Sequence, residues 1–394
     1  MSSPPGARTS LVFRSLRFWA GHLVLLQIAL FALVWILYGG LELRGHGRDY
    51  FARAADFWLE REPGRFANAP GIENVLVPAA TAAIAKVSNS AGVAFTDSMF
   101  ALLTAAPYPL FIYGVTYLVR RMRTSGLLAL AAAAMLYTSG MIPYMASWGG
   151  YLDGVSYLLM LPVLLRPESL AVYSVTFVLQ CLNHYLGALS LVMLAFVWHS
   201  MKALDTPDGR TYWLRSVVPR ALVSALVLAA FMWFWESQYP EASRARQAIA
   251  ESKWSDPAGV VQEVAGPFPW TLLSTLKLGI VPIVALMLAP LPHRRLRALT
   301  LAMPIAAAAA LTFVFVDVTR VATMLVLPSL LVTIHAAAAA EMPAAARRRL
   351  RRLIVATALA NLLIPNYYVN NGEVHVPPSG IIRGLIESVV PPGR

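Results

Sequence analysis

Charged residues are scarce in this chain. They make up 13% of its 394 residues, whereas 58% are hydrophobic, and the mean hydropathy is +0.61. That balance excludes a water-soluble fold of this length. Ten spans of about 21 residues would consume roughly half of the chain, which agrees with the hydrophobic excess. The sequence therefore predicts an all-α protein, a polytopic integral membrane bundle of about 10 spans.

Cysteine is almost absent as well. The one cysteine, Cys181, lies in an apolar run, so the chain builds neither a disulfide framework nor a thiolate metal site. The sequence also lacks a Walker loop, a dinucleotide-binding glycine fingerprint, a His-Glu-x-x-His motif and a Gly-x-Ser-x-Gly motif. These absences remove the common signals of nucleotide hydrolysis, metalloproteases and serine hydrolases. No metal or cofactor is implied.

Acidic residues are outnumbered, because 32 lysines and arginines stand against 20 acids, a net charge of +12. The basic residues cluster between apolar runs, so the excess indicates membrane topology and not nucleic-acid binding. Arginines precede an N-terminal run, 19–41, that is too long for a signal-peptide core. We expect a retained first span with a cytoplasmic N-terminus. High alanine and arginine with only four lysines indicates a GC-rich bacterial genome, so the expected location is the bacterial inner membrane. The clusters are Arg8, Arg14 and Arg17; Arg120, Arg121 and Arg123; Arg166; Lys202, Arg210, Arg215 and Arg220; Arg294, Arg295 and Arg297; and Arg347, Arg348, Arg349, Arg351 and Arg352.

Two apolar segments leave the topology open. If 170–201 crosses once and 75–88 does not cross, the later basic clusters fall outside, against the positive-inside bias. Either 170–201 is a broken re-entrant pair, or 75–88 crosses as well. We favour the broken pair, because Asn183-His184 interrupts 170–201 and 75–88 is short enough for an interfacial helix. The further apolar runs are 94–119, 126–145, 147–165, 217–236, 270–290, 298–316, 321–340 and 353–368.

The favoured topology collects unusual polar groups on one face. Residues 1–368 form a single transmembrane domain, with outer loops 42–93 and 237–269, and residues 369–394 form an extracytoplasmic tail. Asp153, His184 and the Asp317–Arg320 turn then lie at the same outer side. Ionisable side chains at membrane depth cost a few kcal/mol on insertion scales, so such residues are functional candidates unless a partner explains them.

Asp153 follows Trp148-Gly149-Gly150-Tyr151-Leu152 and precedes an apolar run. It is either a helix N-cap or a group that binds a substrate hydroxyl or a cation. His184 lies in Leu182-Asn183-His184-Tyr185. It is either a hydrogen-bond partner between helices or, with Asn183, part of a site.

Asp317 and Arg320 interrupt two apolar runs at a spacing of three residues, so on a helix they are neighbours. They form an ion pair, or Arg320 offers its planar donors to a phosphate while Asp317 holds it in place. The two interpretations are compatible.

An amphipathic helix is predicted over residues 48–60. Its apolar stripe includes Phe51 and Trp58, and its polar stripe includes Asp49 and Asp56. Such a helix lies on the membrane surface, where its acids form a solvated face. Asp49 begins the helix, so it is either a cap or a general base that projects into the outer cavity.

This layout resembles the GT-C superfamily of membrane glycosyltransferases, which take a sugar from a polyprenyl-phosphate carrier. The similar part covers residues 19–165. It contains the first span, Asp49-Tyr50 with Ala55, Trp58 and Leu59, then Gly64-Arg65-Phe66, Pro70 and the small-residue helix from Val75 toward Gly92. The superfamily often shows paired acids at the catalytic position, whereas Tyr50 and Phe51 follow Asp49 here.

The resemblance implies that Asp49 is the catalytic base, since an acid in the first outer loop has that role in the superfamily. With it, we expect Arg320 and His184 to bind the donor phosphate, and Asp153, Asp317, Asp56 and Asn183 to orient substrate. The expected partners are a polyprenyl-phosphate-linked sugar, a glycan, lipid or protein acceptor, and membrane lipids. The alternatives are a polymerase or ligase of lipid-linked glycans, or a transporter or flippase of lipid-linked sugars.

Overall fold

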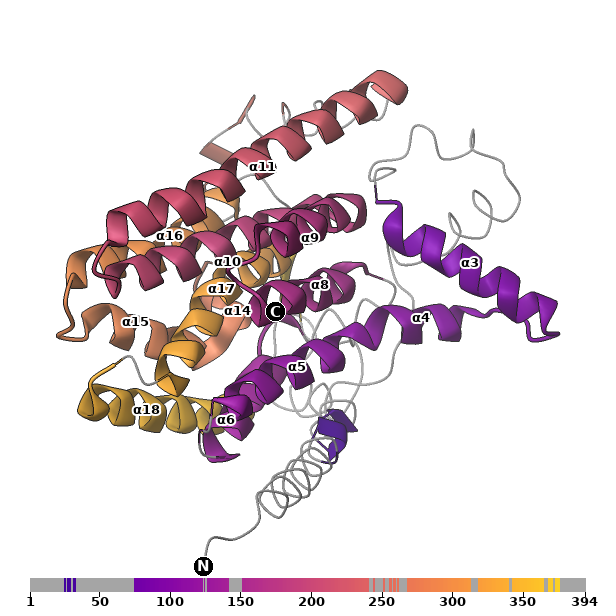
Figure 1. The fold of residues 1–394 in the computed structure, drawn as a ribbon. Coiled ribbons are helices and arrows are strands. Elements are labelled where there is room, and N and C mark those ends of the chain that lie inside the picture. The colour runs from indigo at the N-terminus through magenta and orange to yellow at the C-terminus, as the bar shows by residue number, and fades with distance from the viewer. Residues whose placement is uncertain are drawn as a thin grey trace, which may run out of the picture.

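The computed structural model describes residues 74–122, 124, 126–141, 151–240, 268–312, 318–339, 342–364, 368–370 and 373–375, with isolated positions in 25–32 and 244–261. The described part is helical apart from one short strand pair (Figure 1). Its elements are α3 (Leu76–Ser90), α4 (Asp97–Ala105), α5 (Pro107–Arg121), α6 (Gly126–Tyr137), α8 (Asp153–Leu165), α9 (Leu170–Asn183), α10 (Tyr185–Leu204), α11 (Gly209–Gln238), α14 (Phe268–Leu276), η3 (Lys277–Gly279), α15 (Ile280–Leu288), α16 (Arg294–Thr312), α17 (Val318–Ala338), α18 (Ala344–Leu363), β1 (Tyr368–Asn370) and β2 (Glu373–His375).

Four helical stretches in the described residues are long and apolar enough to cross a membrane. They are Asp97–Arg121, Tyr185–Leu204, Gly209–Gln238 and Thr319–Ala338. Other predicted runs are apolar but give shorter helices, among them α6 and α8. Four candidate spans in the described residues therefore support the predicted membrane character. The first predicted span, 19–41, lies largely outside the described residues.

The predicted all-α class holds except at the C-terminal end. There β1 and β2 pair antiparallel, with Val369 opposite Val374. The sequence Asn371-Gly372 separates the two strands, and Asn-Gly is the pair most typical of a two-residue hairpin connection. The run predicted at 353–368 ends earlier, because α18 stops at Leu363.

Residues 170–201 do not form one helix, as the favoured topology predicted. α9 ends at Asn183, and His184 takes an extended backbone conformation, with φ of −167° and ψ of 122°, before α10 begins. The two helices then run side by side in opposite directions, because His199 near the end of α10 lies 3.1 Å from the carbonyl oxygen of Pro167, just before α9. α3 contains 15 residues, or about 22 Å of helix, which is too short to cross a bilayer core of about 30 Å.

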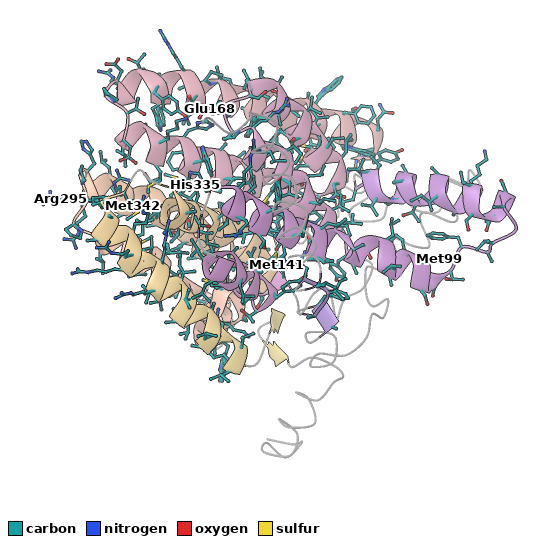
Figure 2. The ribbon with its side chains drawn as sticks, turned by 60° about the horizontal axis from the view of Figure 1, so that its bottom comes forward. Met99, Met141, Glu168, Arg295, His335 and Met342 are labelled. Atoms are coloured by element: carbon teal, nitrogen blue, oxygen red, sulfur yellow. The ribbon has the colours of Figure 1, made fainter. Side chains whose placement is uncertain are left out.

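The basic clusters of the described residues gather at one end of the bundle. The Lys202 ammonium at the end of α10 lies 2.5 Å from Glu168, in the turn between α8 and α9. Arg297 in α16 forms an ion pair with Asp205, just after α10. Arg351 in α18 donates to the carbonyl oxygen of Ala337 at the end of α17. In Figure 2, Glu168, Arg295, His335 and Met342 lie toward one side of the view, and Met141 and Met99 toward the other.

Glu168 is held ionised at this end. Partial burial raises the pKa of its carboxyl group, but hydrogen bonds from Lys202 and Tyr212 outweigh that effect and hold the pKa below its ordinary value.

α17 is the central helix of the bundle. The apolar stretch of α17 is 89% buried within the protein. The apolar stretch of α11, which lies at the edge of the ribbon in Figure 1, is only 17% buried. Helices α5, α10, α14, α15, α16 and α18 all pack against α17. Arg320, in the first turn of α17, is therefore fixed by the most enclosed element of the fold.

A glycine in the first turn of α8 allows this helix to pack closely against its neighbours. A Cβ atom on Gly154 would lie 2.6 Å from the backbone oxygen of Thr104 and 2.7 Å from the Tyr108 ring, so the first turn of α8 touches the α4–α5 junction directly. Gly126, by contrast, has open space around its Cα.

We predict that Gly154→Val destabilises the protein by about 1–3 kcal/mol, because overpacking must displace backbone and not only a flexible side chain. Gly126→Val is the matched control, and its thermal midpoint in detergent should stay close to that of the wild type. Equal midpoints for the two variants would contradict the close approach of α8 to α4 and α5.

Candidate functional site

Three segments distant in the sequence meet at the end of the bundle opposite the basic clusters. Asp153 lies at the start of α8, His184 in the break between α9 and α10, and Arg320 in the first turn of α17. The Lys202 end of α10 is about 26 Å along the helix from His184. The structure therefore brings together Asp153, His184 and Arg320, which are the members of the predicted outer-side group that it describes.

Arg320 is the centre of the group. Its Nε lies 2.6 Å from Oδ2 of Asp153, and one terminal nitrogen lies 2.8 Å from Nε2 of His184. The guanidinium carbon lies 4.9 Å from the centre of the Tyr151 ring, in cation–π contact. The Asp153 side chain is 2% exposed and that of Arg320 13%, so the acid is buried while the base keeps some accessible surface.

The sequence predicted an ion pair of Arg320 with Asp317, which lies outside the described residues, and gave Asp153 the role of orienting sugar hydroxyls or the arginine. The structure pairs Arg320 with Asp153. The N-cap interpretation of Asp153 is wrong, because the N-cap residue of α8 is Leu152. The Asp153–Arg320 ion pair could have been inferred from physical chemistry. A buried carboxylate needs an opposite charge, and Asp153 and Arg320 were both predicted at the outer side.

His184 accepts a hydrogen bond from Arg320 through Nε2. A guanidinium has donors only, so Nε2 is the acceptor in this contact. The amide of Leu186 donates to Nδ1 at 3.3 Å as the N-cap contact of α10, and a neutral imidazole accepts only one of these two hydrogen bonds at a time. His184 therefore acts on Arg320 and orients the guanidinium. The Tyr185 ring stacks on the imidazole with centroids 5.0 Å apart.

Asn183 ties the α9–α10 break to α8. Its amide nitrogen donates to the carbonyl oxygen of Leu152 at 3.0 Å and to the hydroxyl of Ser156 at 2.9 Å. Gln180 adds a bond from its amide nitrogen to the carbonyl oxygen of Ser156 at 2.7 Å. Within the described residues, the buried side-chain oxygens of Asn183 and Gln180 accept no hydrogen bond. The amide donors of Asn183 thus have a positioning role, since they fix the residues on either side of Asp153 in the first turn of α8.

Asp49 and Asp56 also lie outside the described residues, so the predicted catalytic base has no described position. Among the described residues, no three His, Cys, Asp or Glu side chains come close enough to hold a metal ion.

Lys277 was not among the predicted site residues, although it stands in the predicted apolar run 270–290. Lys277 has a left-handed backbone, with φ of 50°, and interrupts the helix between α14 and α15. Its ammonium donates to the carbonyl oxygens of Asn361 at 3.2 Å and Ile364 at 2.5 Å, at the end of α18. Asn361 in turn accepts from the amide of Leu278 at 2.9 Å. A lysine at membrane depth is the signal that could have identified this junction.

No family model, curated protein or solved structure matches this chain.

We predict strong coupling between Asp153 and Arg320. Asp153→Asn and Arg320→Gln should each destabilise the protein by about 3 kcal/mol, because removing one partner leaves a buried charge unpaired. The double variant should lose much less than the sum. Thermal unfolding in detergent gives the four free energies.

The exposed pair Glu168 and Lys202 is the matched control for that cycle, with side chains 49% and 47% exposed. The coupling energy of Glu168→Gln and Lys202→Gln should stay below about 1 kcal/mol. A coupling between Asp153 and Arg320 as small as that of the control would contradict the buried ion pair.

Proposed function

We propose that the protein is a membrane glycosyltransferase that moves a sugar from a polyprenyl-phosphate-linked donor to an acceptor hydroxyl on the extracytoplasmic face. The observation that carries the proposal is the Asp153–Arg320–His184 group. It presents an oriented guanidinium with some accessible surface, at the end of the bundle opposite the basic clusters of the described residues. The expected acceptor is a glycan, a lipid or a protein.

The distribution of charge supports the orientation. Basic residues are enriched in cytoplasmic loops, so the end with Lys202, Arg297 and Arg351 belongs in the cytoplasm. The Arg320 end then faces the periplasmic side of a bacterial inner membrane. The same proposal includes a polytopic arrangement of about 10 spans, with the first span at 19–41 and the second outer loop at 237–269.

The chemistry calls for a cation at the donor phosphate. The acceptor oxygen attacks the anomeric carbon, and the bond from that carbon to the phosphate oxygen breaks. The donor phosphodiester carries one negative charge, whereas the released polyprenyl phosphate approaches two. A guanidinium fixed beforehand stabilises the charge that develops on the phosphate in the transition state. Arg320 has this role, and Asp153 and His184 hold it in place.

Asp49 is proposed as the general base, as the resemblance implies. It takes the proton of the acceptor hydroxyl while the new glycosidic bond forms and passes it to solvent afterwards. Asp56 and Asp317 are proposed to orient the sugar or Arg320. Asn183 contributes through the backbone of α8, which its amide holds.

A transporter or flippase is the second candidate, because two helices are interrupted at polar residues. α9 and α10 meet at His184, and α14 and α15 are separated by the 3-10 turn that begins at Lys277. Interrupted helices of this kind line the substrate sites of many secondary transporters. In proteoliposomes that contain labelled donor lipid, movement of the sugar lipid without cleavage of its phosphate bond would favour this candidate and contradict the transferase.

We predict that Asp49→Asn lowers sugar transfer by a factor of about 10² to 10⁴, the usual contribution of a general base. The assay follows labelled sugar from the polyprenyl-phosphate donor to a mixture of envelope glycans, lipids and proteins. Asp97→Asn, at an exposed acid in the first turn of α4, is the matched control and should keep the wild-type rate. Full activity of Asp49→Asn would remove this residue from the mechanism. Replacing the donor by an oligosaccharide-diphosphate lipid separates the transferase from a polymerase or ligase.

We also predict that Arg320→Lys lowers kcat by a factor of about 10² or more with a smaller change in KM. A lysine keeps the charge but cannot contact Asp153, His184 and a phosphate with one planar group. Arg295→Lys, at an exposed arginine of the basic end, is the control. The kcat of the variant and of the wild type is measured only on the folded fraction that each protein gives in size-exclusion chromatography. An unchanged kcat in that fraction would show that Arg320 is structural.

A further inference from the structure

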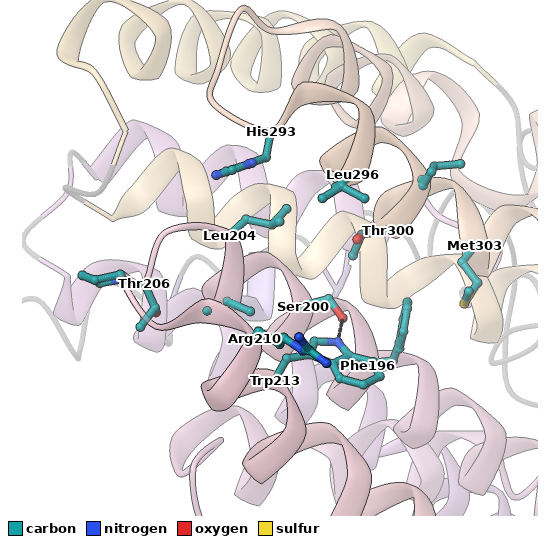
Figure 3. Close-up of a pocket in the computed structure, with 14 residues that line it drawn as sticks. Phe196, Ser200, Leu204, Thr206, Arg210, Trp213, His293, Leu296, Thr300 and Met303 are labelled. Carbon is teal, nitrogen blue, oxygen red and sulfur yellow. Dashed lines mark hydrogen bonds between the residues drawn. The ribbon is translucent and has the colours of Figure 1, made fainter.

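A cavity lies at the basic end of the bundle, far from Arg320. It occupies about 560 Å³ between the end of α10, the start of α11 and the start of α16. Figure 3 shows side chains from these three elements pointing into it. Its wall is mostly apolar, with Phe196, Leu204, Leu296 and Met303 among the lining residues. None of the residues assigned to sugar transfer lines it.

The mouth of the cavity is basic. Arg210 in the first turn of α11 and His293 just before α16 line it, and Arg294 and Arg295 follow His293 in the chain. Within the described residues, the side chain of Arg210 makes no hydrogen bond or ion pair, whereas the nearby Asp205 is neutralised by Arg297. Asp208, the other nearby acid, is exposed. The mouth therefore carries a surplus of positive charge.

The backbone at the mouth of the cavity has an unusual conformation at His293. His293 has φ of 56°, a left-handed conformation that a residue with a side chain rarely takes, although histidine is among the more tolerant types. Its carbonyl oxygen accepts from the amide of Arg297 in the first turn of α16. In the opposite wall the indole of Trp213 donates to the hydroxyl of Ser200 at 2.9 Å, so this polar atom of the wall is already satisfied (Figure 3).

One side of the cavity is lined by exposed apolar side chains. Leu296, Leu299 and Met303 of α16 line it and remain 52%, 66% and 46% exposed. In a membrane, exposed leucines on a long helix face hydrocarbon. From Leu204 to Phe196 the apolar wall extends about 12 Å along α10, close to the roughly 15 Å of one leaflet of the hydrocarbon core.

We propose that this cavity binds an anionic phospholipid of the cytoplasmic leaflet, with the phosphate at Arg210 and His293 and an acyl chain along α10 and α16. The charge of the mouth and the depth of the apolar slot fit that ligand together. Basic pockets between membrane helices on the cytoplasmic side are suited to acidic headgroups. A second copy of the chain fits less well, because a symmetric interface would bring two basic mouths together.

The test titrates the full-length protein, purified in a neutral detergent, with phosphatidylglycerol or with phosphatidylcholine of the same acyl chains, and counts bound lipids by native mass spectrometry. Wild-type protein should bind phosphatidylglycerol at least fivefold more tightly. Arg210→Ala should weaken phosphatidylglycerol binding about fivefold and leave phosphatidylcholine unchanged. Arg215→Ala removes the same charge from an exposed position of the same helix, outside the cavity lining, and should behave as the wild type.

Four results would overturn the proposal. The first is equal affinity of the wild type for the two lipids. The second is an equal loss in Arg210→Ala and Arg215→Ala, which would reduce the effect to net charge. The third is a dimer whose abundance depends on Arg210, which would assign the cavity to a second copy. Competition by soluble glycerol phosphate at the concentration of the lipid would also contradict it, because the acyl chain would then contribute nothing. Sugar transfer is not measured, so the result is independent of the proposed function.

Discussion

The ion pair between Asp153 and Arg320 holds together parts of the chain that are far apart in the sequence. A buried carboxylate or guanidinium alone is penalised by several kcal/mol, so the first turn of α8 and the first turn of α17 stay together once the bundle has formed. His184 joins this contact from the α9–α10 break. The position of all three side chains, and with it the proposed chemistry, depends on a pair that neither local sequence nor helix propensity specifies.

The two ends of the bundle differ in how their charges are paired. At the basic end, Lys202 with Glu168 and Arg297 with Asp205 are partly exposed pairs, and Arg210 has no partner in the described residues. At the other end the described residues hold the enclosed pair of Asp153 and Arg320. This asymmetry is the basis of the proposed orientation, and it separates the two proposed phosphate sites, one for a membrane lipid and one for the sugar donor, by about the thickness of the bilayer core.

Much of the fold was predictable, and the central contact was not. Apolar runs and basic clusters predicted the helices, and Asn183-His184 predicted the break in 170–201, because a polar dipeptide within an apolar run disfavours a continuous span. Helical spacing favoured Asp317 as the partner of Arg320, since local rules see only neighbours. The Asp153–Arg320 contact depends instead on which helices pack against α17. Hydrophobic periodicity does not encode that choice, because lipid and neighbouring helices are equally apolar.

The junction at Lys277 has a consequence for biosynthesis. The ammonium of Lys277 has its acceptors at the end of α18, which the ribosome makes more than 80 residues later. Until α18 arrives, the segment from α14 to α15 carries a charge without these two carbonyl acceptors, and insertion of that segment into hydrocarbon is disfavoured. α18 therefore completes the junction between α14 and α15, and this junction reaches its final packing only after translation has passed α18.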